Sequence, residues 1–264
     1  MKRNKKLILL TITIIAVFSL SVWKYSSCSQ TSKNANSESK EYVVLLHGLG
    51  RTSISMKKME KYLNEKGYIV INFGYASVIH DIDKVSIKLD KVIKDECKDT
   101  NKKINFVTHS LGGIVVRYYL KDKKNKRTGR VVMLAPPNKG SEIADWLKNK
   151  TFCKWIAGPT AWQLGTDPDS IPMALGNVQF DLGVIAGNKS VLPFLSSKIP
   201  GEDDGAVSVE RAKVSGMKDF IKVHSTHTFI MNDKKVQDQV DHFFRNGMFK
   251  KNKKDKINHG KTQK

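Results

Sequence analysis

Short aliphatic runs alternate with longer amphipathic stretches along the chain from residue 41 onward. The runs are rich in residues typical of buried strands, and they cover 42–46, 68–73, 104–108, 131–134, 184–186 and 220–223. The stretches between them repeat apolar residues at helical spacing, and they cover 56–65, 82–97, 112–120, 142–147 and 234–245. Strands that alternate with helices over short turns predict an α/β fold, in which helices cover both faces of a mostly parallel sheet.

Residues 148–181 interrupt this alternation. They carry a concentration of residues that break regular elements, namely Trp155, Pro159, Trp162, Pro168 and Pro172. We therefore expect this segment to run as an excursion over one end of the sheet.

The N-terminal segment predicts export. Four Lys and Arg residues precede residues 7–23, a run of 17 residues without a charge. This run reaches the lower limit of about 17 residues for a membrane-spanning helix, and the preceding charges favour an N-terminus that stays in the cytoplasm. We predict a membrane anchor or signal segment over 1–24, and we favour an uncleaved anchor because no good small-residue cleavage site follows. The body would then lie on the extracytoplasmic side, or be secreted if the segment is cleaved.

Composition divides the rest of the chain into three parts. Residues 25–40 are rich in Ser and Asn and nearly free of apolar residues, so they predict a disordered tether. Residues 41–245 hold the alternating pattern and predict one domain, while residues 246–264 form a basic tail. With 40% hydrophobic residues, 18 Gly and 7 Pro in 264 residues, the chain is neither collagen-like, low-complexity nor a polytopic membrane protein.

The formal net charge of +21 is concentrated at the two ends of the chain. Residues 1–40 carry +6 and residues 245–264 carry +7, which together are 13 of the 21 excess charges. The body is therefore only moderately basic. Because no nucleic-acid-binding motif accompanies the charge, we do not expect specific binding of nucleic acid.

The three cysteines, Cys28, Cys97 and Cys153, show no metal-ligand or CxxC spacing. A disulfide between Cys97 and Cys153 is one alternative in an oxidising compartment. We favour the interpretation that both are buried or incidental thiols.

A candidate nucleophile lies between a predicted strand and a predicted helix, at Ser110 in the sequence His109-Ser110-Leu111-Gly112-Gly113. A nucleophilic serine needs a tight strand-to-helix turn, and glycines next to it give that turn room to close. This segment resembles the nucleophile motif of the α/β-hydrolase family, in its bacterial lipase and esterase branch. It departs from the family pattern at Thr108, where a glycine is usual and a β-branched residue would crowd the turn.

A second motif, His47-Gly48-Leu49-Gly50, follows the first predicted strand. Ester hydrolysis places negative charge on the carbonyl oxygen, which must be met by preorganised N–H donors. The resemblance implies that these donors are the backbone N–H groups of Leu49 and Leu111. We interpret His47 as fixing the first turn by hydrogen bonding. The segment from Pro136 to Ser141 also resembles these lipases, without a catalytic role.

The acid of the expected triad is predicted between the last two strands. There Glu202-Asp203-Asp204-Gly205-Ala206-Val207 resembles the D-G-x-V loop of the family, in which the Asp before Gly is the acid. This implies Asp204. Asp203 remains an alternative, because spacing alone does not rank adjacent carboxylates.

Candidate bases follow this loop, at His224, His227, His242 and His259. His242 falls within an apolar helical face and His259 within the basic tail. His224 directly continues a strand, whereas His227 lies in a loop and in a sequence, residues 226–231, that resembles the family's T-H-T-x-I-M segment. We therefore predict His227 as the base, and we interpret His109 as a structural residue of the nucleophile turn.

Taken together, the resemblance implies a serine hydrolase that cleaves carboxylic esters of lipids or small molecules without a metal or organic cofactor. The same triad serves thioesterases, amidases and acyltransferases, which remain alternatives. A non-catalytic basic membrane-associated protein is an alternative of a different class. The apolar part of the excursion is interpreted either as an acyl-binding or lid segment or as simple coverage of the sheet edge; it contains Phe152, Trp155, Ile156, Trp162 and Leu164.

Overall fold

The structure, a computed structural model, describes residues 41–121, 127–148, 158 and 160–251. The predicted anchor and tether, the tail from residue 252 and part of the excursion lie outside these residues. Among the excluded positions are Cys28, Cys153, His259 and the aromatic residues Phe152 and Trp155. Within the described part, no helix is both long enough and apolar enough to cross a membrane.

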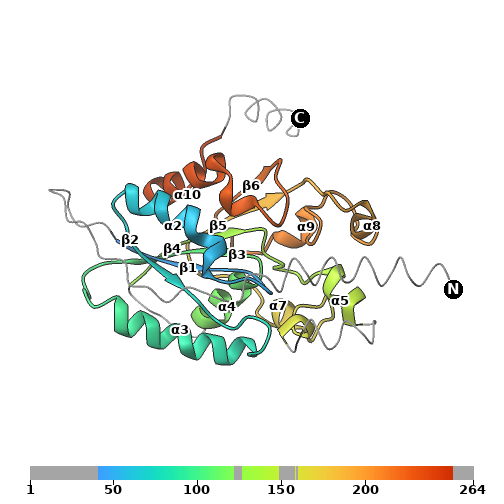
Figure 1. Cartoon of the computed structure of the whole chain (residues 1–264), viewed down its shortest axis with the longest axis horizontal. Coiled ribbons are helices and arrows are strands. Elements are labelled where there is room, and N and C mark those ends of the chain that lie inside the picture. The colour runs from blue at the N-terminus through green and yellow to red at the C-terminus, as the bar shows by residue number, and fades with distance from the viewer. Residues whose placement is uncertain (1–40, 122–126, 149–157, 159, 252–264) are drawn as a thin grey trace. The chain divides into compact units, whose positions relative to one another are not determined.

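A six-stranded sheet forms the centre of the molecule (Figure 1). All its neighbouring strands are parallel, in the order β2-β1-β3-β4-β5-β6. The strands are β1 (Tyr42–Leu46), β2 (Ile69–Phe73), β3 (Ile104–His109), β4 (Thr128–Leu134), β5 (Leu182–Gly187) and β6 (Asp219–Val223). The prediction of an α/β fold with a parallel sheet is confirmed.

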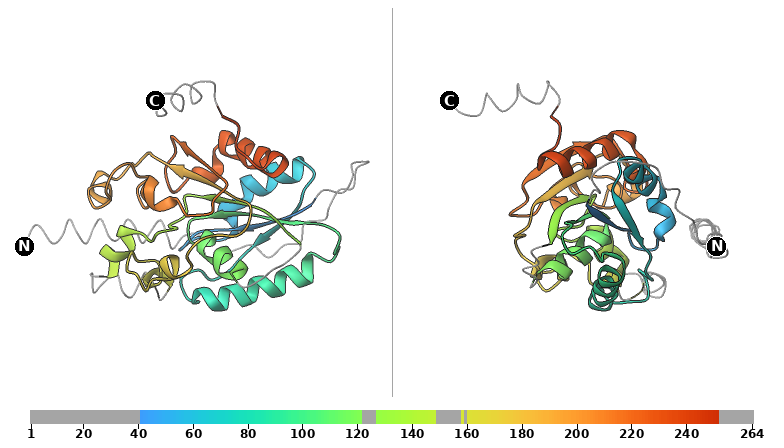
Figure 2. Two further views of the ribbon diagram at one scale, coloured as in Figure 1. Left: turned by 180° about the vertical axis from the view of Figure 1, so that it is seen from behind. Right: turned by 90° about the vertical axis from the view of Figure 1, so that its left-hand side faces the viewer.

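Helices cover both faces of the sheet, as predicted. One face carries α3 (Ile82–Glu96) and α4 (Leu111–Leu120), and the other carries α2 (Lys57–Glu65) and α10 (Lys234–Asn246). Figures 1 and 2 show α2 and α10 together on the side of the sheet opposite α3.

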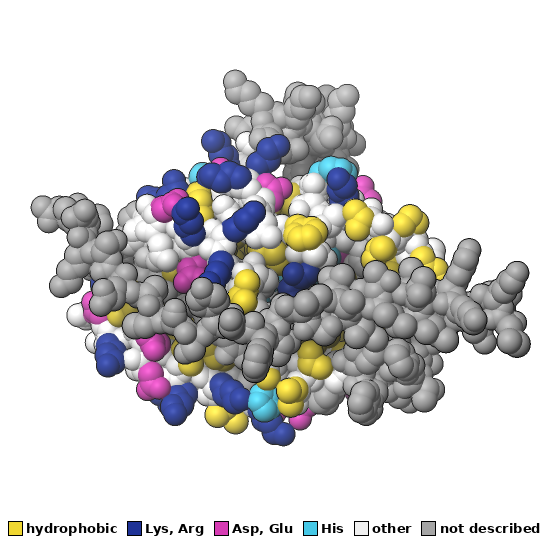
Figure 3. Space-filling view, viewed as in Figure 1, with side chains coloured by type: hydrophobic (Ala, Val, Ile, Leu, Met, Phe, Trp, Pro, Cys, Tyr) yellow, Lys and Arg dark blue, Asp and Glu magenta, His cyan; other side chains and the backbone are white. Residues whose placement is uncertain are grey.

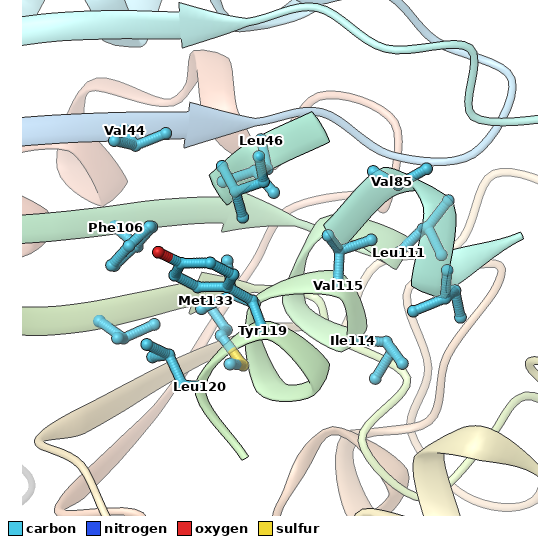
Figure 4. Close-up of a cluster of buried hydrophobic side chains, with 14 of the residues drawn as sticks. Val44, Leu46, Val85, Phe106, Leu111, Ile114, Val115, Tyr119, Leu120 and Met133 are labelled. Carbon is cyan, nitrogen blue, oxygen red and sulfur yellow. The ribbon is translucent and has the colours of Figure 1, made fainter. Parts of the chain in front are cut away.

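Strand β1 shows how the sequence produces this layering. Successive side chains of a strand point to opposite faces. Val44 and Leu46 enter the hydrophobic cluster under α3 and α4, whereas Val43 and Leu45 enter the cluster under α2 and α10. Figure 4 shows the first cluster. Because a fully buried aliphatic side chain contributes about 1.5–3 kcal/mol, a strand that is buried on both faces fixes the centre of the fold.

Several short elements were not predicted. They are the helices α7 (Ile171–Ala174), α8 (Pro193–Ser196) and α9 (Val209–Ala212) and the 3₁₀ turns η1 (Ser53–Met56) and η2 (Ile230–Asn232). The predicted helix 142–147 is present as α5 (Glu142–Lys148). One-turn elements have too few residues to show a periodic pattern, so the sequence does not reveal them.

The folded body continues past residue 245. Helix α10 ends at Asn246, and the next residue, Gly247, has a left-handed φ of 71°. The chain turns back there, so that Phe249 is buried against Phe243. The N–H of Phe249 donates to a carboxylate oxygen of Asp219 at the start of β6. Phe249, which falls within the predicted basic tail, therefore belongs to the core.

Cys97 lies at the end of α3, inside the first hydrophobic cluster. Burial raises the pKa of its thiol to about 11, so the thiol is protonated at neutral pH. A buried thiol is what we favoured for this position. The alternative of a disulfide with Cys153 is not tested, because Cys153 lies outside the described residues.

The surface charge is mixed on the face shown in Figure 3. Lys and Arg side chains are scattered there, with Asp and Glu side chains among them. This arrangement differs from the continuous basic stripe that marks a nucleic-acid-binding face.

Candidate active site

Four of the predicted site segments meet at the carboxyl edge of the sheet. The residues from His47 follow β1, Ser110 follows β3, Asp204 lies in the connection after β5, and His227 lies in the loop after β6. In a parallel sheet the carboxyl ends of all strands lie on one edge, where α/β proteins place their ligands. The topology therefore brings together residues that are far apart in the sequence.

Ser110 occupies a strained turn between β3 and α4. Its φ of 52° and ψ of −120° are rare for a residue with a side chain, and only Ala135 shares a positive φ among the described non-glycine residues. The neighbouring glycine, Gly112, is required by a close approach, since a Cβ there would lie 2.8 Å from both the Cβ and the carbonyl oxygen of Leu46. Glycine at this position therefore lets α4 begin directly against the end of β1.

Thr108, at the position where the family pattern has glycine, fits this turn. Its side chain is fully buried, and Gly113 provides the space beside it, since a Cβ on Gly113 would lie 3.3 Å from the Thr108 hydroxyl. The expected crowding by a β-branched residue is avoided because the helix presents a glycine to it.

Ser110, His227 and Asp204 form one line of hydrogen bonds. The Ser110 hydroxyl lies 3.0 Å from Nε2 of His227, and Nδ1 of His227 lies 2.8 Å from Oδ2 of Asp204. Because a carboxylate only accepts, Nδ1 carries the proton and Nε2 accepts from the serine. This is the tautomer in which an imidazole can take a proton from a serine hydroxyl.

Asp204 is held in place by its own loop. Its side chain is buried, and its other oxygen, Oδ1, accepts from the N–H groups of Ala206 and Val207 at 3.0 and 2.9 Å. The carbonyl oxygen of Asp204 also accepts from the N–H of His227 at 2.9 Å. These contacts leave Oδ2 directed at the imidazole.

Asp203, the alternative acid, has a different environment. Its Oδ1 accepts from the Ser196 hydroxyl at 2.9 Å and from the N–H of Gly205 at 2.7 Å. Both contacts are structural contacts within the loop. The geometry separates the two adjacent carboxylates that the sequence could not rank.

The other candidate bases lie away from Ser110 or outside the described residues. His224 is exposed, and Nδ1 of His242 lies 2.9 Å from the carbonyl oxygen of Met248 at the end of α10. His259 is not among the described residues. Of the three candidate bases that the structure describes, it brings His227 to the serine.

The turn after β1 packs against the residue before Ser110. A Cβ on Gly48 would lie 2.7 Å from Nδ1 of His109, so only glycine permits this approach. The turn carries the N–H of Leu49, and Leu111 is the first residue of α4, whose N–H has no acceptor within the helix. Leu49 thus lies in the turn that packs against His109, and Leu111 directly follows Ser110 at the start of α4.

His47 fixes the path of the chain after β1. Its Nε2 accepts from the N–H of Tyr75 at 3.3 Å, its Nδ1 donates to the carbonyl oxygen of Gly48 at 3.0 Å, and its ring stacks on that of Tyr75 at 4.1 Å. Burial lowers the pKa of His47, which keeps the ring neutral. These contacts agree with the predicted structural role in the first turn.

His109 makes a contact that the sequence did not reveal. Its ring is buried, its Nε2 lies 2.8 Å from the carbonyl oxygen of His227, and its Nδ1 has no hydrogen-bond partner in the described part of the chain. Burial, and then the nearby His227, hold the pKa of His109 well below its usual range. A neutral His109 therefore supports the loop that carries His227.

The segment after β4 also supports the site. The Ser141 hydroxyl donates to the carbonyl oxygen of Ala206 at 2.8 Å, next to the loop of Asp204. The Asn138 side chain donates to the carbonyl oxygen of Ala212 and accepts from Arg117. The segment from Pro136 to Ser141 thus holds the chain near Ala206 and Ala212 in place by hydrogen bonds. The contact of Ser141 with Ala206 could not be inferred from the motif alone.

This sheet, with a strained serine turn after a central strand and a histidine and an aspartate after later ones, is the arrangement of an α/β-hydrolase. The chain has the α/β-hydrolase fold. It belongs to the family described as "Domain of unknown function (DUF7379)", whose model matches residues 11–179, more than half of the chain.

Solved structures of lipases and esterases share the fold. Lipase BlEst2 of Bacillus licheniformis, in its mature form, is similar over 81% of this chain and 95% of that chain, with 20% identity and a TM-score of 0.62. The metagenomic carboxyl esterase MGS0156 is similar over 79% of this chain and 71% of that chain, with 16% identity and a TM-score of 0.57. At these identities the similarity establishes the fold.

A curated relative matches over a shorter segment. Triacylglycerol lipase 2 of Saccharomyces cerevisiae is 30% identical over 95 residues, which are 34% of this chain. The match spans 29% of the length of the yeast protein.

Proposed function

We propose that this protein is a serine hydrolase that cleaves carboxylic esters, with Ser110 as nucleophile, His227 as base and Asp204 as the orienting acid. The observation that carries the proposal is the line of contacts from the Ser110 hydroxyl through the imidazole to the Asp204 carboxylate, at 3.0 and 2.8 Å. The buried Asp204 and the strained turn at Ser110 support it, because both hold reactive groups in one orientation.

In the first half of the reaction, the Ser110 oxygen attacks the carbonyl carbon of the ester while Nε2 of His227 takes the hydroxyl proton. The resulting imidazolium is stabilised by Asp204 through the proton on Nδ1. The tetrahedral intermediate then collapses, the bond to the alcohol oxygen breaks, and Nε2 gives its proton to the departing alcohol. The acyl group remains on Ser110 as an ester.

In the second half, water attacks the carbonyl carbon of this acyl-enzyme and gives a proton to Nε2 of His227. Collapse of the second tetrahedral intermediate breaks the bond to the Ser110 oxygen, which takes the proton back. The products are the alcohol and the carboxylic acid. The chain is then in its starting state.

We assign the stabilisation of the oxyanion to the N–H groups of Leu49 and Leu111. The position of Leu111 at the start of α4 supports this, because helix N-termini carry partial positive charge and free N–H donors. Loss of one such donor lowers turnover by about 100- to 1000-fold in serine hydrolases.

The similar proteins support the proposed substrate class, since they are a triacylglycerol lipase, a lipase and a carboxyl esterase. They favour oxygen esters of lipids or small molecules over thioesters and amides. We further propose that residues 1–24 anchor the protein in the membrane and leave the body on the extracytoplasmic side. The basis is the apolar run 7–23 with its preceding charges.

The full chain and its Ser110→Ala variant should be compared on matched hexanoyl substrates: an oxygen ester, a thioester, an anilide and an ester with an added alcohol acceptor. The proposal predicts fastest turnover of the oxygen ester, with free hexanoic acid as product and almost no activity in the variant. Faster thioester or amide cleavage, or transfer to the alcohol, would favour the alternative enzymes. Turnover of none of the substrates would favour a non-catalytic protein.

A further inference from the structure

Arg51 ends the turn that carries Leu49, and its side chain has no partner among the described residues. Six arginines lie in the part of the chain that the structure describes. Five of them form side-chain hydrogen bonds or ion pairs: Arg117, Arg127, Arg130, Arg211 and Arg245. The guanidinium of Arg51 forms neither within the described residues.

The backbone holds Arg51 firmly beside the site. Its N–H donates to the carbonyl oxygen of Gly48 at 3.2 Å, which closes the turn. The N–H of Gly50, a residue with a left-handed φ of 65°, donates to the hydroxyl of the buried Ser77 at 3.0 Å. Arg51 is thus two residues from Leu49, a proposed oxyanion donor. Hydrogen bonds to Gly48 and to Ser77 hold the turn that carries both residues.

The charge of Arg51 reaches the interior of the site. The side chain is partly buried, and burial lowers its pKa, although a guanidinium stays protonated in proteins. Burial is the main cause that lowers the pKa of His47 and of His109, and the positive charge of Arg51 adds a smaller lowering to both. No carboxylate contributes to the pKa of Arg51, so its charge is not balanced by a described acid.

A partly desolvated charge without a partner is unfavourable unless a ligand supplies the opposite charge. Carboxylate and phosphate groups match the planar donor pattern of a guanidinium and can bind it with two hydrogen bonds. We propose that Arg51 binds an anionic group, a carboxylate or a phosphate, carried by the ester that Ser110 cleaves. This makes Arg51 a specificity-determining residue, and the inference rests on the proposed ester hydrolysis.

The test compares two esters that differ in one charge. Mono-4-nitrophenyl adipate and 4-nitrophenyl hexanoate have the same leaving group and the same chain length, but only the adipate ends in a carboxylate. The full chain should be assayed beside Arg51→Gln, Arg51→Lys and the control Lys58→Gln. The control removes the same charge from an exposed position in α2, a few residues further along.

The measured quantity is the ratio of kcat/KM for the adipate to kcat/KM for the hexanoate. We expect Arg51→Gln to lower this ratio about tenfold, as for the loss of a charge-assisted hydrogen bond. We expect Arg51→Lys to lower it less, because it keeps the charge but loses the paired geometry. Lys58→Gln should leave the ratio within about twofold, since an exposed charge is screened. An unchanged ratio in Arg51→Gln, with both esters losing equally, would exclude the carboxylate of a soluble ester as the ligand of Arg51.

A second pair identifies the source of the anion. Phosphatidylglycerol and diacylglycerol with the same acyl chains, presented in the same detergent micelles, differ in the phosphate group. A preference for phosphatidylglycerol that Arg51→Gln removes would place the anion in a lipid. A preference confined to the adipate would place it in a soluble ester. Absence of an Arg51-dependent preference in both pairs would refute the anionic subsite.

Failure of the proposed function itself gives a different result. The hexanoate has no charge, so its hydrolysis by the unmodified chain, and the loss of that hydrolysis in Ser110→Ala, test the triad independently of Arg51. If the hexanoate is cleaved through Ser110 but neither substrate pair shows a preference that depends on Arg51, only the inference about Arg51 fails.

Discussion

Nε2 of His109 donates a hydrogen bond of 2.8 Å to the main-chain carbonyl oxygen of His227. The residue directly before the proposed nucleophile therefore holds the loop of the proposed base. The two rings lie 4.9 Å apart, and His109 also contacts the turn at Gly48. The spacing between Ser110 and His227 thus depends on a contact that takes no part in proton transfer.

Removing the donor of His109 should lower turnover through the position of His227. We expect His109→Leu to lower kcat about 10- to 100-fold with little change in KM, because a displacement of about 1 Å in a catalytic group has effects of this size. His109→Gln should recover much of the loss, since its amide places an N–H donor near the same carbonyl. Steady-state kinetics and thermal unfolding of both variants provide the measurement. Equal kcat in the Leu and Gln variants would show that the hydrogen bond is not what matters.

Burial of His109 and His47 as neutral rings should make the fold sensitive to mild acid. Burial lowers the pKa of both histidines in the folded state, so below about pH 6.5 the unfolded chain binds protons that the folded chain does not. The free energy of unfolding should therefore fall as the pH decreases from 7 to about 5.5, by up to about 1.4 kcal/mol per pH unit for each such histidine. Urea unfolding at several pH values measures this slope.

Two matched variants, His109→Gln and His224→Gln, test the slope of the free energy of unfolding against pH. The first removes a buried histidine and should reduce the slope, whereas the second replaces an exposed one and should leave it unchanged. An identical slope in His109→Gln would mean that His109 is not kept neutral by the fold.

Replacement of Asp204 should lower turnover far more than replacement of the adjacent Asp203. Asp204→Asn replaces the acceptor that faces Nδ1 of His227 and favours the wrong imidazole tautomer, which lowers turnover by about 10⁴-fold in serine triads. Asp203→Asn keeps an oxygen that can accept from Ser196 and Gly205, so we expect a loss of less than about tenfold. Assays of kcat on one ester decide between them. A larger loss in Asp203→Asn would reverse the assignment of the acid.

Replacement of His227 and of His224, the two histidines after β6, should have different effects on ester hydrolysis. His227→Ala should abolish ester hydrolysis at every pH, because no other described group lies where it could accept the Ser110 proton. His224→Ala should retain most of the activity, since its side chain is exposed and is not in contact with the serine. Both variants should be assayed from pH 5 to 9. An active His227→Ala protein would remove this residue from the proposed mechanism.

Local sequence determined much of this structure. The strands β1, β3 and β5 are fully buried, and β4 is buried over its last four residues, whereas the edge strands β2 and β6 are partly exposed. The central strands could therefore be predicted from their short aliphatic runs. Ser110 was indicated because the turn needs Gly112 and Gly113 within three residues of it. Local sequence thus indicates strands and turns, whose residues are close together in the chain.

Contacts across long sequence separations could not be predicted. His109 contacts His227 and Ser141 contacts Ala206, and no local pattern at either position indicates its partner. The choice of Asp204 over Asp203 likewise depends on which carboxylate the loop turns toward His227. The burial of Phe249 beyond the predicted end of the domain follows from a chain reversal at Gly247 that a basic tail does not suggest.

The most direct test of the account is the site of covalent modification by a fluorophosphonate, which reacts with activated serines. The full chain should be labelled, digested and examined by mass spectrometry, beside Ser110→Ala. We predict one phosphonate adduct, on Ser110, and no adduct in the variant, which should keep the thermal unfolding midpoint of the unmodified chain within a few degrees because it loses only one oxygen. An adduct on another serine, or equal labelling of the Ser110→Ala variant, would contradict the assignment of Ser110 as the nucleophile.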